Sequence, residues 1–159
     1  METTKYGKYI VEAPNVSKSE IHPNMFGQVG INNELNGTMP GAFYLSCALV
    51  LKKDEIGPRN KPHNHDFNEY LVFLGTNPED PQDLGGEVEL WLENEKHLIT
   101  KSAAVFVPQG LYHTPLIFKR VDKPMILIRV GNALKDSHLS YSQDPRWASL
   151  PDEPIPLPE

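Results

Sequence analysis

Short apolar runs separated by turn-forming residues make up most of the chain. Fifteen prolines and eleven glycines punctuate the sequence, and the runs between them have the length of strands rather than of periodic helices. The runs are rich in Val, Ile, Leu, Phe or Tyr, which favour strands. The pattern therefore predicts a mostly β protein, with strands at residues 9–12, 42–52, 69–74, 86–92, 96–99, 103–107, 114–118 and 124–130.

The spacing of these strands predicts how they pack. Many short strands at intervals of roughly 8 to 12 residues are typical of a sandwich or barrel, because each strand must bury one face against a second sheet. An all-β jelly-roll barrel fits best. Asn94 and Glu95 are predicted to form a tight turn. Residues 76–84 are polar, carry two prolines, and form a longer loop that either covers a barrel mouth or only connects two strands.

The end of the chain differs from the rest. Residues 144–159 hold five prolines, which exclude a regular helix or a central strand. We predict one barrel domain over residues 1–143 and an extended arm over residues 144–159. The apolar residues Trp147, Leu150, Ile155 and Leu157 either anchor this arm on the barrel or on a neighbouring subunit, or leave a frayed terminus.

Composition narrows the class of protein. A chain of 159 residues closes a single core. Its net charge is -6 with scattered basic residues, which argues against nucleic-acid and membrane partners. Cys47, the one cysteine, lies in an apolar run and fits a buried small hydrophobe better than a catalytic thiol. The chain begins without a secretory signal and contains no long apolar span, so we expect a cytoplasmic protein.

One cluster of residues suggests a metal site. His63 and His65 are one residue apart, which places both imidazoles on the same face of a strand. Glu69 returns to that face if the chain stays extended, and a barrel can bring His113 to the same place. Three neutral imidazoles and one carboxylate suit one divalent Fe(II), Mn(II), Ni(II), Co(II) or Zn(II) ion and leave one or two positions open. Taken singly, each of these residues is more often an ordinary surface or capped side chain than a metal ligand.

The segments around these residues resemble two motifs of the cupin superfamily. Residues 57–75, GPRNKPHNHDFNEYLVFLG, match the first motif, in which His-x-His and Glu lie between two glycines, with the last gap one residue short. Residues 102–117, SAAVFVPQGLYHTPLI, match the second at Pro108, Gly110 and His113. Ser102 replaces the first Gly of that motif and Ile117 replaces its Asn, and neither change removes a metal ligand.

The resemblance implies a fold and a range of functions. It implies a double-stranded β-helix, a homodimer, and one metal ion held by the four ligands named above. The superfamily includes dioxygenases, isomerases, decarboxylases, lyases and non-catalytic sugar-binding or sensory domains, so the fold alone does not give the reaction.

Strand alternation suggests which other side chains share the interior with the metal. Phe73 follows the inward direction of Glu69, and Ile117 follows that of His113. Ser46 lies on a small, partly polar face that also carries Tyr44, as a ligand cavity requires.

Two further residues have open interpretations. Arg129 lies in an apolar strand, so its charge either pairs with a carboxylate, which we favour, or binds an anionic ligand. Tyr112 lies either near the pocket or outside it, and we expect Tyr44 or Tyr112 to assist proton transfer.

The sequence thus favours a metal-dependent enzyme that acts on a small oxygenated organic molecule, as a dioxygenase or as a Lewis-acid isomerase or lyase. The alternative is a non-catalytic binding or sensory protein with the same metal. A purely structural metal is the third possibility, and it fits less well because four ligands leave open positions on an octahedral ion.

Overall fold

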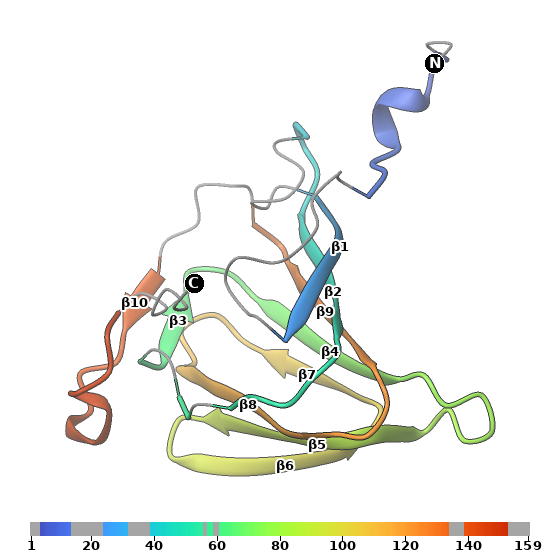
Figure 1. Ribbon diagram of the computed structural model, residues 1–159. Coiled ribbons are helices and arrows are strands. Elements are labelled where there is room, and N and C mark those ends of the chain that lie inside the picture. Colours follow the sequence, from blue (N-terminus) through green and yellow to red (C-terminus); the bar gives the residue numbers. More distant parts are fainter. Residues whose placement is uncertain are drawn as a thin grey trace.

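The computed structural model describes residues 4–13, 24–31, 39–55, 57–58, 61–133 and 139–152. Strands in these residues form two antiparallel five-stranded sheets that pack as a jelly-roll barrel (Figure 1). Sheet A has the order β1-β2-β9-β4-β7, and sheet B the order β10-β3-β8-β5-β6. The strands are β1 (Met25–Ile31), β2 (Tyr44–Val50), β3 (His63–His65), β4 (Glu69–Gly75), β5 (Asp83–Leu92), β6 (Glu95–Lys101), β7 (Ala103–Val107), β8 (His113–Val121), β9 (Met125–Gly131) and β10 (Leu139–Tyr141).

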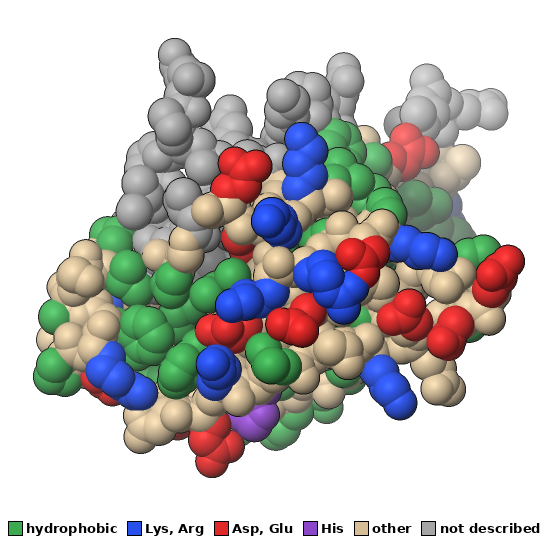
Figure 2. All heavy atoms as spheres, turned by 60° about the horizontal axis from the view of Figure 1, so that its bottom comes forward, with side chains coloured by type: hydrophobic (Ala, Val, Ile, Leu, Met, Phe, Trp, Pro, Cys, Tyr) green, Lys and Arg blue, Asp and Glu red, His purple; other side chains and the backbone are tan. Residues whose placement is uncertain are grey.

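The core lies between the two sheets. Phe73 and Leu127 face it from sheet A, and Leu90 and Phe118 face it from sheet B, each with at most 1% of its surface exposed. Full burial of such a side chain contributes about 1.5–3 kcal/mol. The outer face of sheet B is exposed to solvent. In Figure 2, which brings β5 and β6 forward, acidic and basic side chains are interspersed on this face.

Strand β8 is irregular, and this overturns one expectation. His113 pairs with Leu92 but Leu116 pairs with Leu90, so β8 has one more residue than β5 over this stretch. The extra residue reverses the alternation that follows. Phe118 therefore fills the core, and Ile117 points to the opposite face instead of joining His113 in the interior.

Most of the predicted strands are confirmed. Seven of the eight are present, with ends shifted by three residues or fewer. The strand predicted at residues 9–12 is wrong, because Gly7–Tyr9 form a short 3-10 helix and residues 10–13 pair with no strand among the described residues. Strands β1, β3 and β10 were not among the predicted strands. Their segments lack strong alternation; β1 becomes a strand by pairing with β2, and β3 and β10 pair with each other.

The connections also differ from the expectations in detail. The tight turn between β5 and β6 consists of Glu93 and Asn94, one residue earlier than predicted, and Glu93 adopts a φ of 49°. The loop after β4 lies at the end of that strand opposite Glu69, so it does not cover the histidine cluster. The arm predicted over residues 144–159 is not extended throughout, since Pro145–Trp147 form a 3-10 turn. Its remaining predicted anchors, Ile155 and Leu157, lie outside the described residues. None of the helices in the described part of the chain is long and apolar enough to cross a bilayer.

Candidate metal centre

Three histidines meet at one end of the barrel. His63 and His65 lie on β3, and His63 pairs directly with His113 at the start of β8. Nitrogen atoms of the three rings lie within 4.8 Å of one another. The side chains therefore share a small volume, as predicted from the spacing of His63 and His65 and from the resemblance.

Glu69 completes the cluster from the other sheet. Its Oε2 lies 3.3 Å from Nε2 of His65 and 3.2 Å from Nε2 of His113, and the residue is 4% exposed. Glu69 reaches the histidines in a different way from the one expected, because the chain does not stay extended from His65 to Glu69. It turns at residues 66–68 and enters sheet A, so the carboxylate reaches the imidazoles across the barrel.

The hydrogen bonds around the rings leave metal-binding atoms free. Nδ1 of His113 lies 3.1 Å from the carbonyl oxygen of Leu111, so its N–H donates there and Nε2 keeps its lone pair. Nδ1 of His63 lies 3.5 Å from Oγ1 of Thr114. Both ring nitrogens of His65 and Oε2 of Glu69 are buried without a hydrogen-bond partner among the described residues. Buried polar atoms are rarely left in this state, and a bound cation satisfies them.

The electrostatics favour the protonation states that a metal requires. Burial, together with the neighbouring His113 and His65, lowers the pKa of His63 to about 3, although Glu69 acts in the opposite direction. Burial alone raises the pKa of Glu69, but His113 and His65 outweigh it and bring that pKa to about 2. At neutral pH the site therefore presents a neutral imidazole at His63 and an anionic carboxylate. This donor set fits a borderline divalent ion of the Fe(II), Mn(II), Ni(II), Co(II) and Zn(II) group.

The turn before His113 fixes the two ligand-bearing segments to each other. The N–H of Gly110 donates to the carbonyl oxygen of His65 at 3.0 Å, and Asn64 Nδ2 donates to the carbonyl oxygen of Gly110 at 3.1 Å. The N–H of Gln109 donates to Oδ1 of Asn68 at 2.8 Å. Gly110 has a φ of 85°, which glycine adopts without strain.

Sequence reasoning missed two aromatic residues at the site. The ring of Phe67 stacks on His65 with centroids 4.4 Å apart, and the ring of Tyr141 lies 6.3 Å from that of His63. A Cβ at Gly131 would lie 2.4 Å from Cε2 of Phe67. The glycine at the end of an apolar strand was a usable signal of close packing, whereas nothing local to Tyr141 indicated its position.

Arg129 and Ser46 are brought together on the interior face of sheet A. An Nη atom of Arg129 donates to Oγ of Ser46 at 3.2 Å. Among the described residues no carboxylate pairs with Arg129, so the favoured structural pairing stays a prediction. The guanidinium is close enough to His63 to lower its pKa. A cation thus lies in the barrel beside the four candidate ligands.

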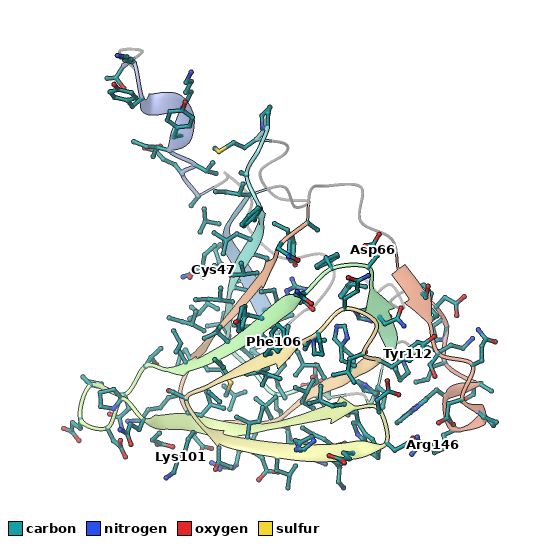
Figure 3. All side chains as sticks on the ribbon, turned by 180° about the vertical axis from the view of Figure 1, so that it is seen from behind. Cys47, Asp66, Lys101, Phe106, Tyr112 and Arg146 are labelled. Atoms are coloured by element: carbon teal, nitrogen blue, oxygen red, sulfur yellow. The ribbon has the colours of Figure 1, made fainter. Side chains whose placement is uncertain are left out.

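The other predicted pocket residues occupy different positions. Tyr44 lies in one cross-strand row with Gly131 and Glu69, on the inward face of β2. Phe73 is fully buried in the core. The N–H of Tyr112 donates to the Glu93 carboxylate at 3.0 Å, and alternation directs its side chain away from that of His113; Figure 3 shows it near the end of the β5–β6 hairpin.

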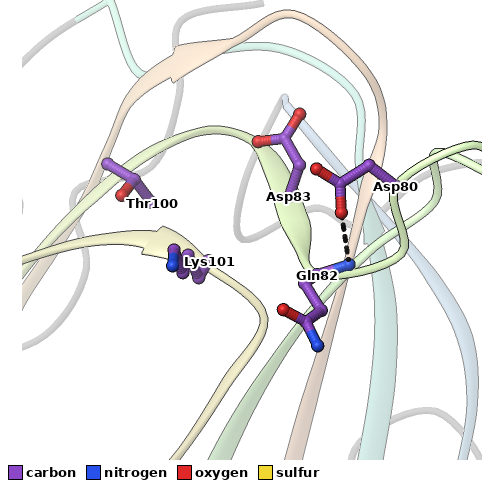
Figure 4. A pocket seen from close by; sticks show the side chains of 5 residues that line it. All are labelled: Asp80, Gln82, Asp83, Thr100 and Lys101. Atoms are coloured by element: carbon purple, nitrogen blue, oxygen red, sulfur yellow. Dashed lines mark hydrogen bonds between the residues drawn. The ribbon is translucent and has the colours of Figure 1, made fainter.

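A surface hollow lies far from the three histidines, at the opposite end of β4 and at the start of β5. Figure 4 shows its lining, which consists of Asp80, Gln82, Asp83, Thr100 and Lys101. The two aspartates already accept backbone N–H bonds within the loop, at 3.3 Å from Gln82 and 3.2 Å from Gly85. These groups stabilise the loop, and we assign the hollow no chemical role.

Comparisons with known proteins bear on the fold of the chain. No family model and no curated protein sequence matches the chain. Oxalate oxidase in complex with glycolate superposes with a TM-score of 0.52 and 12% identity, over 84% of this chain and 63% of that one. The chain has the cupin fold.

Two further cupin-like structures are similar at lower scores. The DMSP lyase DddQ from Ruegeria pomeroyi DSS-3 has a TM-score of 0.46 and 14% identity, over 81% of this chain and 56% of that one. A sugar phosphate isomerase of the cupin superfamily from Silicibacter pomeroyi has a TM-score of 0.48 and 14% identity, over 85% and 78% of the two chains. The chain thus spans less than two thirds of the length of the lyase and of the oxidase.

Proposed function

We propose that this cupin is a divalent-metal-dependent enzyme that acts on a small, oxygenated, anionic organic molecule. The observation that carries the proposal is the convergence of His63, His65, His113 and Glu69 beside Arg129, whose charge meets no carboxylate among the described residues. When bound, a divalent ion at such a site supplies Lewis acidity or O2 activation. The reaction is accordingly an oxidative cleavage, an isomerisation or a lyase reaction.

Arg129 is the reason why we propose an anionic substrate. A buried or half-buried guanidinium without a carboxylate partner is costly, and a bound carboxylate or enolate offsets that cost with a charge-assisted hydrogen bond. Ser46 accepts a hydrogen bond from one Nη of the guanidinium, and no carboxylate in the described part of the chain accepts from the other N–H groups. Three neutral imidazoles and one carboxylate also leave a net positive charge on a divalent ion, so both cations attract the same molecule.

Tyr44 is our candidate for proton transfer. It lies on the inward face of sheet A, in the cross-strand row that contains Glu69, so a ligand between Arg129 and the metal ligands reaches its hydroxyl group. Tyr112 faces away from this space and is the weaker candidate.

The test uses metal-loaded protein and a panel of dicarbonyl, enediol and hydroxy-acid compounds. Substrate-dependent O2 consumption with bound iron indicates a dioxygenase, and turnover without O2 indicates an isomerase or lyase. Arg129→Met is expected to weaken binding of anionic panel members by at least tenfold, whereas Arg120→Met, which changes an exposed arginine on sheet B, leaves it unchanged. Binding without turnover of any panel member would favour the non-catalytic binding or sensory function instead, and equal binding by both variants would refute the role of Arg129.

We also propose that two copies associate through the outer face of sheet A. Three cross-strand rows cover this face, and every residue in them is apolar or aromatic: Ile31, Leu45, Val130, Tyr70 and Phe106; Val29, Cys47, Ile128, Val72 and Ala104; and Phe26, Leu49, Ile126 and Leu74. The charged residues on the strands of sheet A, Glu69 and Arg129, both point inward. An open antiparallel sheet normally carries polar residues on its solvent side, so this face is suited to being covered.

A second copy is the occupant that the face fits. Five strands about 4.8 Å apart and seven residues long at about 3.3 Å each give a face on the order of 500 Å², before side-chain relief is added. Two such faces approach the roughly 1,200 Å² of a stable interface. The face lacks charge, which disfavours acidic or basic partners, and two-fold dimers are the commonest assembly. Light scattering is expected to show a dimer that Val72→Lys dissociates and Leu98→Lys, on exposed β6, does not; a monomeric unmodified protein would refute the interface.

A further inference from the structure

The strand that carries two of the candidate metal ligands has an unusually small connection to the barrel. Strand β3 consists of His63, Asn64 and His65, and its only residue pair with β8 is His63 with His113. On its other side all three residues pair with β10, with Tyr141 opposite His63 and Leu139 opposite His65. Most of the ladder that aligns β3 therefore comes from the C-terminal segment.

Residues 139–152, which we call the C-terminal strap, continue this contact beyond β10. The N–H of Ser142 donates to the carbonyl oxygen of Pro62 at 2.8 Å. The N–H of Lys61 donates to the carbonyl oxygen of Pro151 at 3.0 Å, and its Nζ lies 3.0 Å from the Asp152 carboxylate. The strap thus binds the chain immediately before β3 as well as β3 itself.

The middle of the strap is fastened to the β5–β6 hairpin. Arg146 donates to Oδ1 of Asn94 at 2.5 Å and to both carboxylate oxygens of Asp144. Its guanidinium lies 5.7 Å from the ring centroids of both Trp91 and Trp147, and these two rings meet edge to face at 5.4 Å. In Figure 3, Arg146 lies beside the turn that joins β5 and β6.

The contacts of Arg146 with Asn94, Asp144, Trp91 and Trp147, which we call the lock, connect the protein surface to the candidate metal site. From Tyr141 to Arg146 the strap bridges β3 and a hairpin that is itself fixed in sheet B. If the lock at Arg146 opens, β10 loses its fixed end and β3 keeps one residue pair with β8 and the bonds around Gly110. His63 and His65 then sample orientations in which they do not face Glu69 and His113.

We propose that the C-terminal strap is a positioning element for the metal site, with Arg146 as its lock. The proposal rests on the proposed metal function and adds that metal binding and strap docking are coupled. By linkage, docking that favours metal binding must in turn be favoured by the metal, to the same extent. Arg146 and Trp147 contact no candidate ligand among the described residues, so they act through the segments that they hold, of which β3 carries His63 and His65.

The chain supplies its own reporter for the test, because its two tryptophans, Trp91 and Trp147, both lie in the lock. Three measurements are made on tag-free protein: Zn(II) affinity by competition with a chromophoric chelator, acrylamide quenching of tryptophan with and without Zn(II), and amide hydrogen exchange of residues 61–67 in metal-free protein. The variants are Arg146→Ala and Trp147→Ala, with Arg120→Ala as the matched control because Arg120 is an exposed arginine outside the strap.

We expect Arg146→Ala and Trp147→Ala to bind Zn(II) about tenfold more weakly, as is typical when the support of a ligand is removed. Exchange in residues 61–67 should accelerate while the urea midpoint of global unfolding changes little, which a merely structural role would not produce. Zn(II) should protect the tryptophans of the unmodified protein and of Arg120→Ala from acrylamide.

Two results would overturn the inference, and they are distinguishable. Unchanged Zn(II) affinity and exchange in both strap variants, with normal Zn(II) binding by the unmodified protein, would refute the strap and leave the metal site standing. Failure of the unmodified protein to bind Zn(II) or any other divalent transition metal would refute the proposed function and the coupling together.

Discussion

The metal-free protein is expected to lose stability as the pH falls from about 6.5, because His63 is buried in its neutral form. The pKa of His63 is about 3 in the folded chain, against 6.5 for an unperturbed imidazole. Between these values the unfolded chain binds a proton that the folded chain does not, so acid favours unfolding. The stabilising contribution is complete above pH 6.5 and lost as the pH approaches 3.

The loss of stability can be worked out from the interval between the folded and the unperturbed pKa of His63. Each pH unit corresponds to about 1.4 kcal/mol, so the whole interval amounts to about 5 kcal/mol. Between pH 6.5 and 4.5 the expected loss is about 2 kcal/mol. Glu69 adds to it only at lower pH, because its pKa is lowered to about 2 and its contribution is lost as the pH falls through that value.

Urea unfolding of chelator-treated protein at pH 6.5, 5.5 and 4.5 measures this loss. His63→Gln removes the titrating group, so its free energy of unfolding should fall by about 2 kcal/mol less than that of the unmodified protein over the same range. His97→Gln, at an exposed histidine of β6, should keep the original slope. Equal slopes in the unmodified protein and His63→Gln would refute the assignment of a buried neutral imidazole.

Two substitutions test the packing around the site and the core. Gly131→Ala should cost about 1–3 kcal/mol and weaken metal binding, because its Cβ would lie 2.4 Å from the Phe67 ring that stacks on His65. Gly57→Ala, where no atom lies within 4 Å, is the control, and equal stability of the two variants in urea would contradict the close packing. Leu90→Ala should cost about 2–5 kcal/mol, since Leu90 is fully buried. Leu98→Ala, 56% exposed, should change the unfolding free energy by less than about 0.5 kcal/mol; a cost for Leu90→Ala as small as that would contradict the core.

Local patterns predicted much of the fold and the ligand cluster. Strands β2, β4, β7 and β9 of sheet A and the β5–β6 hairpin have apolar runs bounded by turn residues, so their positions follow from the sequence. His63 and His65 share a face because a strand alternates with period two. Ile117 was placed wrongly because the extra residue in β8 reverses the alternation. Pro115 within that stretch was a usable signal, since a proline inside a sheet marks an edge or a bulge.

Long-range contacts could not be predicted. Tyr141 and Arg146 lie in a segment without hydrophobic periodicity, and they are held near the site only because β10 pairs with β3. The contact of Arg129 with Ser46 could not be predicted either, since the sequence shows that a charge is present in an apolar strand but not which residues face it. Such contacts depend on the topology of the two sheets rather than on neighbouring residues.

The most direct test of the central claim is the metal content of protein purified anaerobically without a metal-binding tag. We predict about one divalent transition-metal ion per chain, with most of it lost in Glu69→Gln and in His113→Ala while both variants remain folded. A folded protein that holds no metal, and takes up none when Fe(II), Mn(II), Ni(II), Co(II) or Zn(II) is supplied, would contradict the account.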